Sequence, residues 1–373
     1  MDEIDNSKWH SLFNAIIMNT DLSNRTCIIT GANSGIGKAT AIGLAKMGAS
    51  IVMLCRNEEK GKISLKEIKE ITGNQSIELM IADLKDYDSL RIFADNFRST
   101  HDKLHILINN AGIMKKKRET NNWGHETTFA TNYLGHFLLT NLLLEMLQSS
   151  APARIINLSS KSHKRGKIDF DNLMLEQNYG RFKAYNNSKL ANILFTYELA
   201  RRLEDSGVTV NVVHPGAART NFGREFSERT RKFLKLFKRF TVSPEEGAKT
   251  SIFLASSPEV ENITGNYWIK CKQANSSKYS YNTHIQKRLW DLSEDLTATA
   301  KEIQITCPIC KFKKIIAFPT SIVGKSVHLT TVSIPKGLVC EHHFQFFIDK
   351  DFNIKGYQTE FDLLKDSQQK GIR

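Results

Sequence analysis

The sequence has no apolar run of about 18 residues or more, so it predicts no membrane-spanning helix. Its first twenty residues begin acidic, with Asp2 and Glu3, and lack the basic start and long apolar core of a secretory signal. The chain has only 6 cysteines in 373 residues, and without an export signal they do not indicate a disulfide framework. We therefore expect a cytoplasmic protein, and peripheral contact with a membrane stays open.

Internal repeats and low-complexity tracts are also missing. The formal net charge is +13, from 52 Lys and Arg against 39 Asp and Glu. Such a balance suits nucleic acid, an anionic membrane or an anionic small molecule. No basic recognition motif with interleaved aromatic residues accompanies it. We therefore expect no nucleic-acid partner, and we interpret the lysine excess as a solvated surface.

From about residue 25 to 300, apolar strand-like runs alternate with amphipathic helical runs. Unalternating apolar strands separated by helices predict a parallel sheet that is covered on both faces. The order is close to that of a doubly wound, dinucleotide-binding Rossmann fold. The predicted strands are 25–30, 50–55, 76–84, 104–112, 153–160 and 208–216, and the predicted helices include 35–48, 58–72, 87–101 and a long one at 129–150.

The pattern changes after residues 288–297. Short strands rich in Thr, Val, Ile and Phe follow, without a helical period. The sequence thus predicts an α/β Rossmann domain and a small C-terminal β-rich module. We expect this module to bind zinc. The predicted domains are an N-terminal amphipathic extension at 1–21, the Rossmann domain at 22–298 and the β-rich module at 299–373.

A glycine-rich stretch, "TGANSGIG" at 30–37, joins the first predicted strand to the first predicted helix. Gly31 and Gly35 permit a tight turn, and Gly37 permits close packing of the helix on the strand. Backbone N–H groups at the start of that helix would face an anion, which the helix dipole favours. This context predicts a cradle for a pyrophosphate.

The end of the second strand selects the cofactor. An acidic residue about 20 positions beyond the glycines would bind a ribose 2′-hydroxyl and favour NAD. Here Arg56 stands in "LCRNEEK", and a guanidinium suits the 2′-phosphate of NADP. The alternative is that Arg56 faces solvent while Glu58 or Glu59 binds the ribose. We expect NADP (NADPH) rather than NAD.

Tyr185 and Lys189 are four residues apart in "AYNNSKLANILFTYELARRL". On a helix this spacing places both side chains on one face. A nearby cation favours the phenolate and lowers the pKa of a tyrosine, so the pair is suited to proton transfer. The alternative is an ordinary surface pair.

With these motifs in order, the chain resembles the short-chain dehydrogenase/reductase superfamily, and within it the retinol dehydrogenase-like branch. The resemblance covers residues 22–297, about three quarters of the chain. It is carried by "TGANSGIGKATAIGLAKMGA", "LCRN", "ADL" (82–84), "LINNAG" (107–112), "TNYLGHFLLT" (131–140), "RIINLSS", the Tyr185 helix, "HPGAARTNF" (214–222) and "SPEEGAKTSIFLA" (243–255).

The resemblance implies a catalytic tetrad of Asn132, Ser160, Tyr185 and Lys189. Tyr185 would exchange a proton with the substrate oxygen, and Lys189 would lower its pKa and bind the nicotinamide ribose. Ser160, preferred to the adjacent Ser159, would hydrogen-bond the carbonyl, and Asn132 would support a water relay to Lys189.

The same motifs imply the cofactor contacts. Asp83 would touch the adenine, Asn110 would line the adenosine side, and Pro215, Gly216 and Thr220 would close over the nicotinamide. The complete predicted set is Gly31, Asn33, Ser34, Gly35, Ile36, Gly37, Arg56, Asp83, Leu84, Asn110, Ala111, Gly112, Tyr185, Lys189, Pro215, Gly216 and Thr220.

The implied activity is NADP-dependent interconversion of an alcohol and an aldehyde or ketone, on an apolar or lipid-like small molecule. Phenylalanines and lysines in 223–246 fit either a helix packed on the core or a basic amphipathic lid that touches a membrane. The rival hypothesis is a catalytically silent dinucleotide-binding scaffold or sensor that recruits a partner through its C-terminal module. A homo-oligomer also stays open.

The C-terminal module contains "CPIC" at 307–310 and "CEHH" at 340–343. Cys307 and Cys310 followed by Cys340 and His342 fit a closed tetrahedral zinc site, which would stabilise a module with a small core. Because "CEHH" resembles a Cys–X–His arrangement, we favour His342 over His343. The alternative is three reduced cysteines without a metal. The superfamily does not normally carry this extension, so it could bind a protein partner or target the enzyme.

Overall fold

The computed structural model describes residues 20–216, 242–319 and 329–359. The chain divides into two compact units, one that ends at Trp290 and one that begins at Asp291. Thr220, most of the predicted lid and nearly all of the N-terminal extension lie outside the described residues. Within those ranges, no helix has the length and apolarity needed to cross a membrane.

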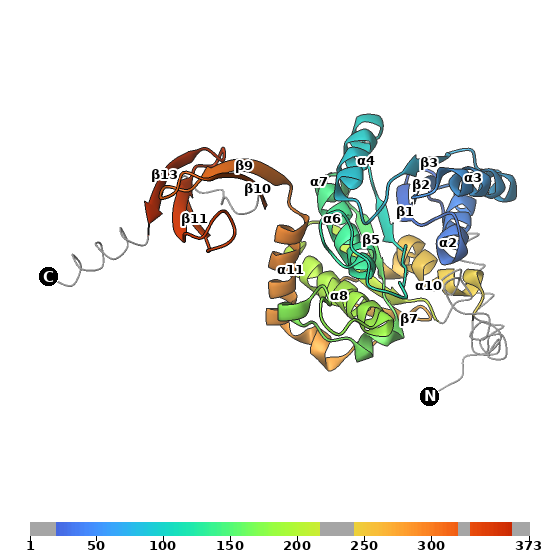
Figure 1. The fold of residues 1–373 in the computed structure, drawn as a ribbon. Helices are drawn as coiled ribbons and strands as arrows, with labels where there is room; N and C mark the ends of the chain where they lie inside the picture. Colours follow the sequence, from blue (N-terminus) through green and yellow to red (C-terminus); the bar gives the residue numbers. More distant parts are fainter. Residues whose placement is uncertain (1–19, 217–241, 320–328, 360–373) are drawn as a thin grey trace. The chain divides into compact units, whose positions relative to one another are not determined.

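The first unit is built around an eight-stranded sheet in the order β3-β2-β1-β4-β5-β6-β7-β8. Seven of its strands pair in parallel, which confirms the predicted doubly wound sheet (Figure 1). The eighth strand is antiparallel, and neither it nor the seventh strand was predicted. The strands are β1 (Thr26–Thr30), β2 (Ser50–Cys55), β3 (Ile77–Ile81), β4 (Ile106–Asn109), β5 (Ala153–Leu158), β6 (Val208–His214), β7 (Tyr267–Ile269) and β8 (Lys272–Ala274).

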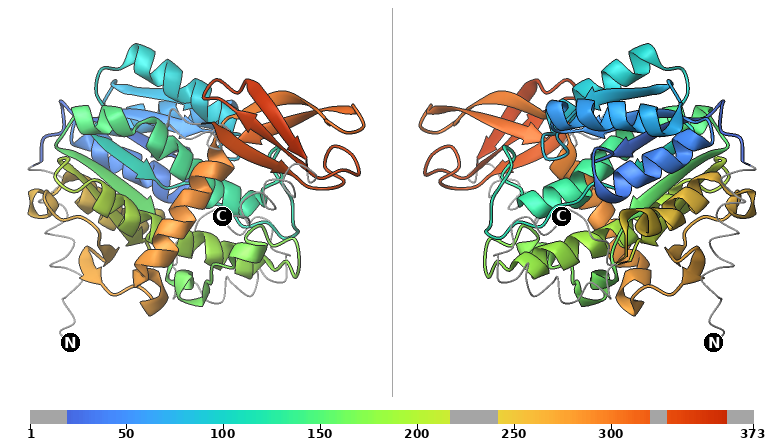
Figure 2. Two further views of the ribbon diagram at one scale, coloured as in Figure 1. Left: turned by 90° about the vertical axis from the view of Figure 1, so that its left-hand side faces the viewer. Right: turned by 90° about the vertical axis from the view of Figure 1, so that its right-hand side faces the viewer.

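Helices cover both faces of this sheet (Figures 1 and 2). On one face α2 packs against α3 and α10, and on the other α4 packs against α6. The helices on the first face are α2 (Gly35–Lys46), α3 (Glu58–Thr72) and α10 (Pro244–Ser256), and those on the second are α4 (Tyr87–Thr100), α5 (Thr127–Phe129), α6 (Gly135–Leu142), α7 (Leu144–Ser149) and α8 (Arg181–Arg202). The last helix of the chain before the β-rich region is α11 (Thr283–Thr297).

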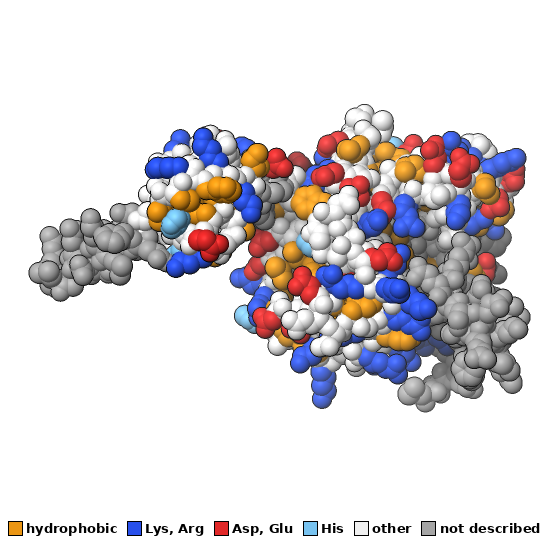
Figure 3. Space-filling view, in the orientation of Figure 1, with side chains coloured by type: hydrophobic (Ala, Val, Ile, Leu, Met, Phe, Trp, Pro, Cys, Tyr) orange, Lys and Arg blue, Asp and Glu red, His pale blue; other side chains and the backbone are white. Residues whose placement is uncertain are grey.

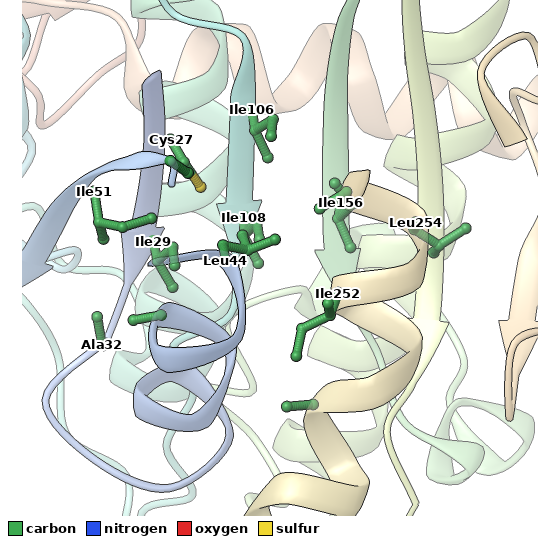
Figure 4. Close-up of a cluster of buried hydrophobic side chains, with 14 of the residues drawn as sticks. Cys27, Ile29, Ala32, Leu44, Ile51, Ile106, Ile108, Ile156, Ile252 and Leu254 are labelled. Atoms are coloured by element: carbon green, nitrogen blue, oxygen red, sulfur yellow. The ribbon is translucent and has the colours of Figure 1, made fainter. Parts of the chain in front are cut away.

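The core lies between the sheet and these helices. Ile29, Ile108 and Ile156 come from three neighbouring strands and face α2 and α10 (Figure 4). A Cβ atom on Gly43 of α2 would lie 2.4 Å from Cδ1 of Ile252 on α10, so the glycine permits close approach of the two helices. Burial on both faces explains why the strands are continuously apolar.

The long helix predicted at 129–150 is wrong as a single element. The structure has α5, a π-helical turn at Ala130–Leu134, α6 and α7 in succession. The apolar pattern continues through these breaks, so it does not reveal them. A π-helical turn in a helix commonly marks a functional site, and this one contains Asn132.

The unit that begins at Asp291 contains the predicted β-rich region. Two antiparallel strands, β9 (Ala300–Thr306) and β10 (Lys313–Pro319), form one sheet. The strands β11 (Thr330–Ile334), β12 (Phe344–Ile348) and β13 (Ile354–Thr359) form a second antiparallel sheet. Both sheets contribute to a single small core.

Candidate active site

A cavity of about 1180 Å³ lies in the first unit, lined by loops that follow the parallel strands. This is where open α/β sheets bind their ligands. The predicted residues that line it are Gly31, Asn33, Ser34, Gly35, Ile36, Gly37, Arg56, Asp83, Leu84, Asn110, Ala111, Gly112, Ser160, Tyr185, Lys189, Pro215 and Gly216. Asn132 lies outside the lining, although its neighbour Thr131 belongs to it.

The glycine-rich loop begins α2 at one end of this cavity. Gly31 and Gly35 have positive φ angles of 67° and 56°, which glycine adopts without steric cost. The helices α3, α4 and α10 each begin with a side chain that caps a backbone N–H, from Asn57, Asp86 and Ser243. Ser34 at the start of α2 makes no such bond. The first N–H groups of α2 are thus left for an anion.

A buried network fixes the loop against the next strand. Thr30 Oγ1 accepts hydrogen bonds from the backbone N–H groups of Asn110 and Ala111, at 2.8 and 2.9 Å. The Asn110 amide donates to the Thr30 carbonyl at 2.7 Å. A Cβ atom on Gly37 would lie 2.4 Å from Asn110 Nδ2 and 2.5 Å from the Gly31 carbonyl oxygen. A side chain at Gly37 would therefore disrupt the cradle.

The adenosine end of the cavity is lined by charged side chains. Arg56 follows β2, and its guanidinium lies 4.0 Å from the Asp83 carboxylate. Lys38 and Lys60 also line the cavity. Glu58 instead pairs with Lys62 along α3, at 2.7 Å, and neither Glu58 nor Glu59 lines the cavity. Glu58 and Glu59, the acidic alternatives to Arg56, therefore lie outside the cavity lining, whereas Asp83 and Glu67 belong to it.

Tyr185, Ser160 and Lys189 converge at the other end. The phenol of Tyr185 hydrogen-bonds Ser160. Lys189 Nζ lies 5.8 Å from the centroid of the Tyr185 ring and donates to the Leu158 carbonyl at 3.0 Å. Ser159 points away and donates to the Lys189 carbonyl at 2.6 Å. Of the two adjacent serines, Ser160 is the one beside the phenol.

Burial dominates the acid–base properties of this group. It raises the pKa of Tyr185 to about 12, although the hydrogen bond from Ser160 lowers it. Burial also lowers the pKa of Lys189 to about 8. The sequence led us to expect a lowered pKa for Tyr185. The structure differs because burial disfavours the phenolate more than the hydrogen bond from Ser160 favours it.

Asn132 lies behind this group in the π-helical turn. Its side chain accepts from the Ile113 backbone N–H at 2.7 Å and donates to the Ile113 carbonyl and to Ser188 Oγ, at 2.9 and 3.0 Å. Its backbone carbonyl accepts from His136 Nδ1 at 3.0 Å. A Cβ atom on Gly112 would lie 3.5 Å from Lys189 Nζ and 3.6 Å from Asn132 Oδ1. The four residues of the predicted tetrad thus lie near the ends of the adjacent strands β4 and β5.

The loop after β6 closes the cavity with Pro215 and Gly216, and Thr220 lies outside the described residues. Two nearby histidines have structural contacts. His214 Nδ1 accepts from the Lys161 backbone N–H at 3.2 Å. His163 Nδ1 donates to the Ser160 carbonyl at 2.7 Å, and burial lowers the pKa of His163.

The comparisons with known proteins agree with this geometry. The family described as short chain dehydrogenase matches residues 25–231. The chain belongs to the short chain dehydrogenase family. It is 45% identical to retinol dehydrogenase 11 of Mus musculus over 278 residues, which cover 74% of this chain and 88% of that protein. Retinol dehydrogenase 14 of Homo sapiens is 42% identical over 296 residues, with 75% and 88% covered.

Solved structures give the same result. A Mycobacterium paratuberculosis protein of unassigned function is 32% identical, with a TM-score of 0.62, and the match covers 75% of this chain and 96% of that one. The Pseudomonas aeruginosa RhlG/NADP active-site complex is 26% identical, with a TM-score of 0.55, and covers 66% and 94%. Family and relatives identify this short-chain dehydrogenase as an NAD(P)-dependent oxidoreductase that acts on alcohols.

Several residues of this short-chain dehydrogenase escaped prediction. Lys38 and Lys60 line the cavity. Lys38 directly follows the glycine loop and Lys60 lies shortly after Arg56, and these positions could have predicted them as cavity residues. Asn192 donates to the same Leu158 carbonyl as Lys189, at 2.9 Å. His136 joins the network through Thr30 Oγ1 at 2.9 Å, and burial lowers its pKa to about 3, so it is neutral.

The predicted metal ligands lie together in the second unit. One ligand atom from each of Cys307, Cys310, Cys340 and His342 lies within 4.8 Å of the others. Among the described residues this is the one group of three or more His, Cys, Asp or Glu side chains arranged to hold a metal ion. His343 instead lies 2.9 Å from Ser333 Oγ through its Nε2 atom.

Proposed function

We propose that the protein is an NADP-dependent oxidoreductase that interconverts an alcohol with an aldehyde or ketone on an apolar substrate. One observation carries this proposal: Tyr185, Ser160 and Lys189 converge on the same cavity that the glycine loop lines. Bound dinucleotide would supply the hydride in reduction and accept it in oxidation.

Tyr185 is the proton donor for the developing alkoxide. With a pKa of about 12 it is protonated at neutral pH, so reduction finds the donor ready. Ser160 bonds the phenol and lies where it can also donate to the carbonyl oxygen of a substrate. Two oriented donors stabilise the charge that forms on that oxygen in the transition state.

Lys189 and Asn132 position the donor and replace its proton. Lys189 has a pKa of about 8, so it carries its charge at neutral pH and can bind the hydroxyls of a ribose. Asn132 lies beside Gly112 and Lys189 and is fixed by three hydrogen bonds. That rigidity suits a residue that holds a water between Lys189 and solvent.

The residues present fit a dinucleotide. Gly31, Gly35 and Gly37 line the cavity, a Cβ atom on Gly37 would clash with the Gly31 carbonyl and the Asn110 amide, and the start of α2 has no side-chain cap. Thr131 Oγ1 is buried beside the cavity and forms no hydrogen bond among the described residues. Arg56, Lys38 and Lys60 favour the additional phosphate of NADP. The structural neighbour with NADP in its active site supports the same choice.

The relatives bear on the substrate, and the charged surface bears on the location of the protein. Retinol dehydrogenase relatives support an apolar alcohol or aldehyde as the substrate. Lys and Arg side chains are spread over the first unit rather than gathered in one stripe on the face shown in Figure 3, which supports a solvated surface. A cytoplasmic protein with peripheral membrane contact, with or without self-association, is consistent with this surface.

We assign the chemistry to residues 22–298 and treat residues 299–373 as a separate module that supplies no group to the reaction. Each tetrad residue lies in the unit that ends at Trp290. The module would hold a structural metal ion and recruit a protein partner.

The test is oxidation of NADPH by the purified full-length chain with a panel of aldehydes and ketones, all-trans-retinal among them. NADH is the competing cofactor, and Tyr185→Phe is measured in parallel. We expect turnover with NADPH that falls by about 10²–10⁴-fold in Tyr185→Phe. Binding of NADPH without turnover on the whole panel would favour a dinucleotide sensor, and binding of neither nucleotide would overturn the proposal.

A further inference from the structure

Two turns in the second unit bring together four side chains that the oxidoreductase reaction does not use. The first turn follows β9 and carries Cys307 and Cys310. The second precedes β12 and carries Cys340 and His342. The turns come from different sheets, and the four side chains meet at the edge of the core that both sheets share.

The distances among these side chains match one tetrahedral ion. Zinc–sulfur bonds of about 2.3 Å and zinc–nitrogen bonds of about 2.0–2.1 Å at tetrahedral angles place sulfur and nitrogen about 3.6 Å apart. His342 Nδ1 lies 3.5 Å from Cys340 Sγ and 3.7 Å from Cys307 Sγ. An iron–sulfur cluster, with several irons between its cysteines, needs ligands that are farther apart than these.

Each turn also directs backbone N–H groups at a cysteine sulfur. The backbone N–H groups of Cys310 and Ile309 hydrogen-bond Cys307, and the backbone N–H of His342 hydrogen-bonds Cys340. Such outer bonds orient metal-bound sulfur and stabilise its charge. Lys311 and Lys314 donate to the carbonyls of Pro308 and Leu338, at 2.9 and 2.7 Å, so an ammonium group lies beside each turn.

We propose that the three cysteines and His342 bind one Zn²⁺ in a closed, structural site. The proposal builds on the separate, non-catalytic module proposed above and does not depend on the reaction of the first unit. Three thiols lose their protons and form three Zn–S bonds, while the neutral imidazole forms one Zn–N bond through Nδ1. The product carries a net charge of −1, three protons are released, and no electron is transferred. All four coordination positions are filled by protein, so no substrate or water can bind the ion.

The structure distinguishes the two adjacent histidines. His342 points Nδ1 at both sulfurs, whereas His343 reaches Ser333 of the neighbouring strand β11. The two imidazoles thus have different partners, and only His342 lies beside the cysteine sulfurs. This assigns His342 as the fourth ligand.

The ion would join the two sheets of the second unit. Their shared core contains ten buried residues, namely Ile303, Ile305, Cys307, Phe318, Val332, Ile334, Val339, Phe344, Phe346 and Ile348. A core of this size gives little stability by itself. Small zinc-finger peptides fold only when the metal is bound, so we expect the folding of this unit to depend on the metal.

The test uses the full-length chain, purified under reducing conditions from zinc-supplemented medium. Its zinc content is measured by mass spectrometry, and its cobalt-substituted form by visible absorption. We expect one zinc per chain and the spectrum of a tetrahedral cobalt–thiolate centre. His342→Ala and Cys310→Ser should lose the metal. His343→Ala should keep it as the matched control, and His342→Cys should keep it because four cysteines also bind zinc.

NADPH turnover is recorded on every sample, so a failure of the oxidoreductase proposal leaves the zinc result readable. A wild-type chain that holds less than a tenth of an equivalent of zinc, even after reconstitution with Zn²⁺, would overturn the proposal. Equal loss of metal in His343→Ala and His342→Ala would overturn the ligand assignment. A Cys307–Cys340 disulfide in the reduced, metal-supplemented protein would also contradict it.

Discussion

In the unit that ends at Trp290, an extensive apolar core holds the sheet, and the polar site residues lie at the ends of strands where the core stops. In the unit that begins at Asp291, ten buried residues form the core, and a cluster of cysteine and histidine lies at its edge. The first unit can lose a site residue and still fold. The second is expected to lose its fold with its ligands. Polar residues thus serve chemistry in one region and stability in the other.

The largest effect on cofactor binding in the first unit is expected from Gly37→Ala. The new Cβ would lie within 2.5 Å of the Gly31 carbonyl oxygen, a backbone atom that cannot shift cheaply. We expect NADPH affinity to fall at least about 100-fold, equivalent to about 2.7 kcal/mol, by calorimetric titration. Gly180→Ala is the control, because its Cβ would meet no atom nearer than 3.7 Å. Normal NADPH binding by Gly37→Ala would refute the cradle.

Lys189→Met should separate chemistry from stability. Burial lowers the pKa of Lys189 from 10.5 to about 8, so the charged form is disfavoured in the folded state. The free-energy cost of holding the Lys189 ammonium in the folded protein is fully present below pH 8. It is relieved as the pH rises from 8 towards 10.5, because the folded protein then holds the neutral amine. The shift corresponds to about 3 kcal/mol. The Leu158 carbonyl keeps its bond from Asn192 in the variant.

We therefore expect Lys189→Met to lose turnover but to gain up to about 3 kcal/mol in free energy of unfolding at pH 7, by the linkage above. Urea denaturation at pH 7 and at pH 9.5 measures it, and the gain should be smaller at the higher pH. A variant that is less stable than the wild type at pH 7 would show that the ammonium stabilises the fold.

The direction of the reaction should decide how it responds to pH. Oxidation needs the phenolate of Tyr185, whose pKa is about 12, so the phenolate fraction rises tenfold per pH unit below that value. We expect kcat/KM for alcohol oxidation to rise from pH 6 to 9 by as much as tenfold per unit. Carbonyl reduction uses the protonated phenol and should not show this rise. A plateau for oxidation near pH 7 would indicate a much lower pKa for Tyr185.

The smallest effect is expected from Arg56→Ala. Loss of a charged contact to the 2′-phosphate should weaken NADPH binding about tenfold, or about 1.4 kcal/mol, and leave NADH binding unchanged. Lys62→Ala is a matched control, because both side chains are 63% exposed and Lys62 pairs with Glu58 outside the cavity. An equal loss of affinity for NADPH and NADH in Arg56→Ala would show that Arg56 contacts a part of the cofactor other than the 2′-phosphate.

The sequence predicted those parts of the structure that depend on local spacing. The parallel strands follow from continuous apolar runs, and the glycine loop follows from Gly31, Gly35 and Gly37. The hairpin between β7 and β8 was missed because its turn, Lys270–Cys271, has positive φ angles of 50° and 55° at residues without the usual Asn-Gly pattern.

Tertiary contacts determine what the sequence did not show. In the π-helical turn, the Asn132 side chain donates hydrogen bonds to Ile113 and Ser188, which are 19 and 56 residues away in the sequence. The raised pKa of Tyr185 results from burial, which spacing does not reveal. The choice between His342 and His343 depends on Ser333, on a neighbouring strand.

We propose that chemistry and metal binding belong to different units of one chain. The most direct test measures zinc content and NADPH turnover together in full-length Tyr185→Phe and Cys310→Ser. We expect Tyr185→Phe to keep one zinc and lose turnover, whereas Cys310→Ser should lose zinc and keep turnover. Loss of both properties in either variant would contradict the division.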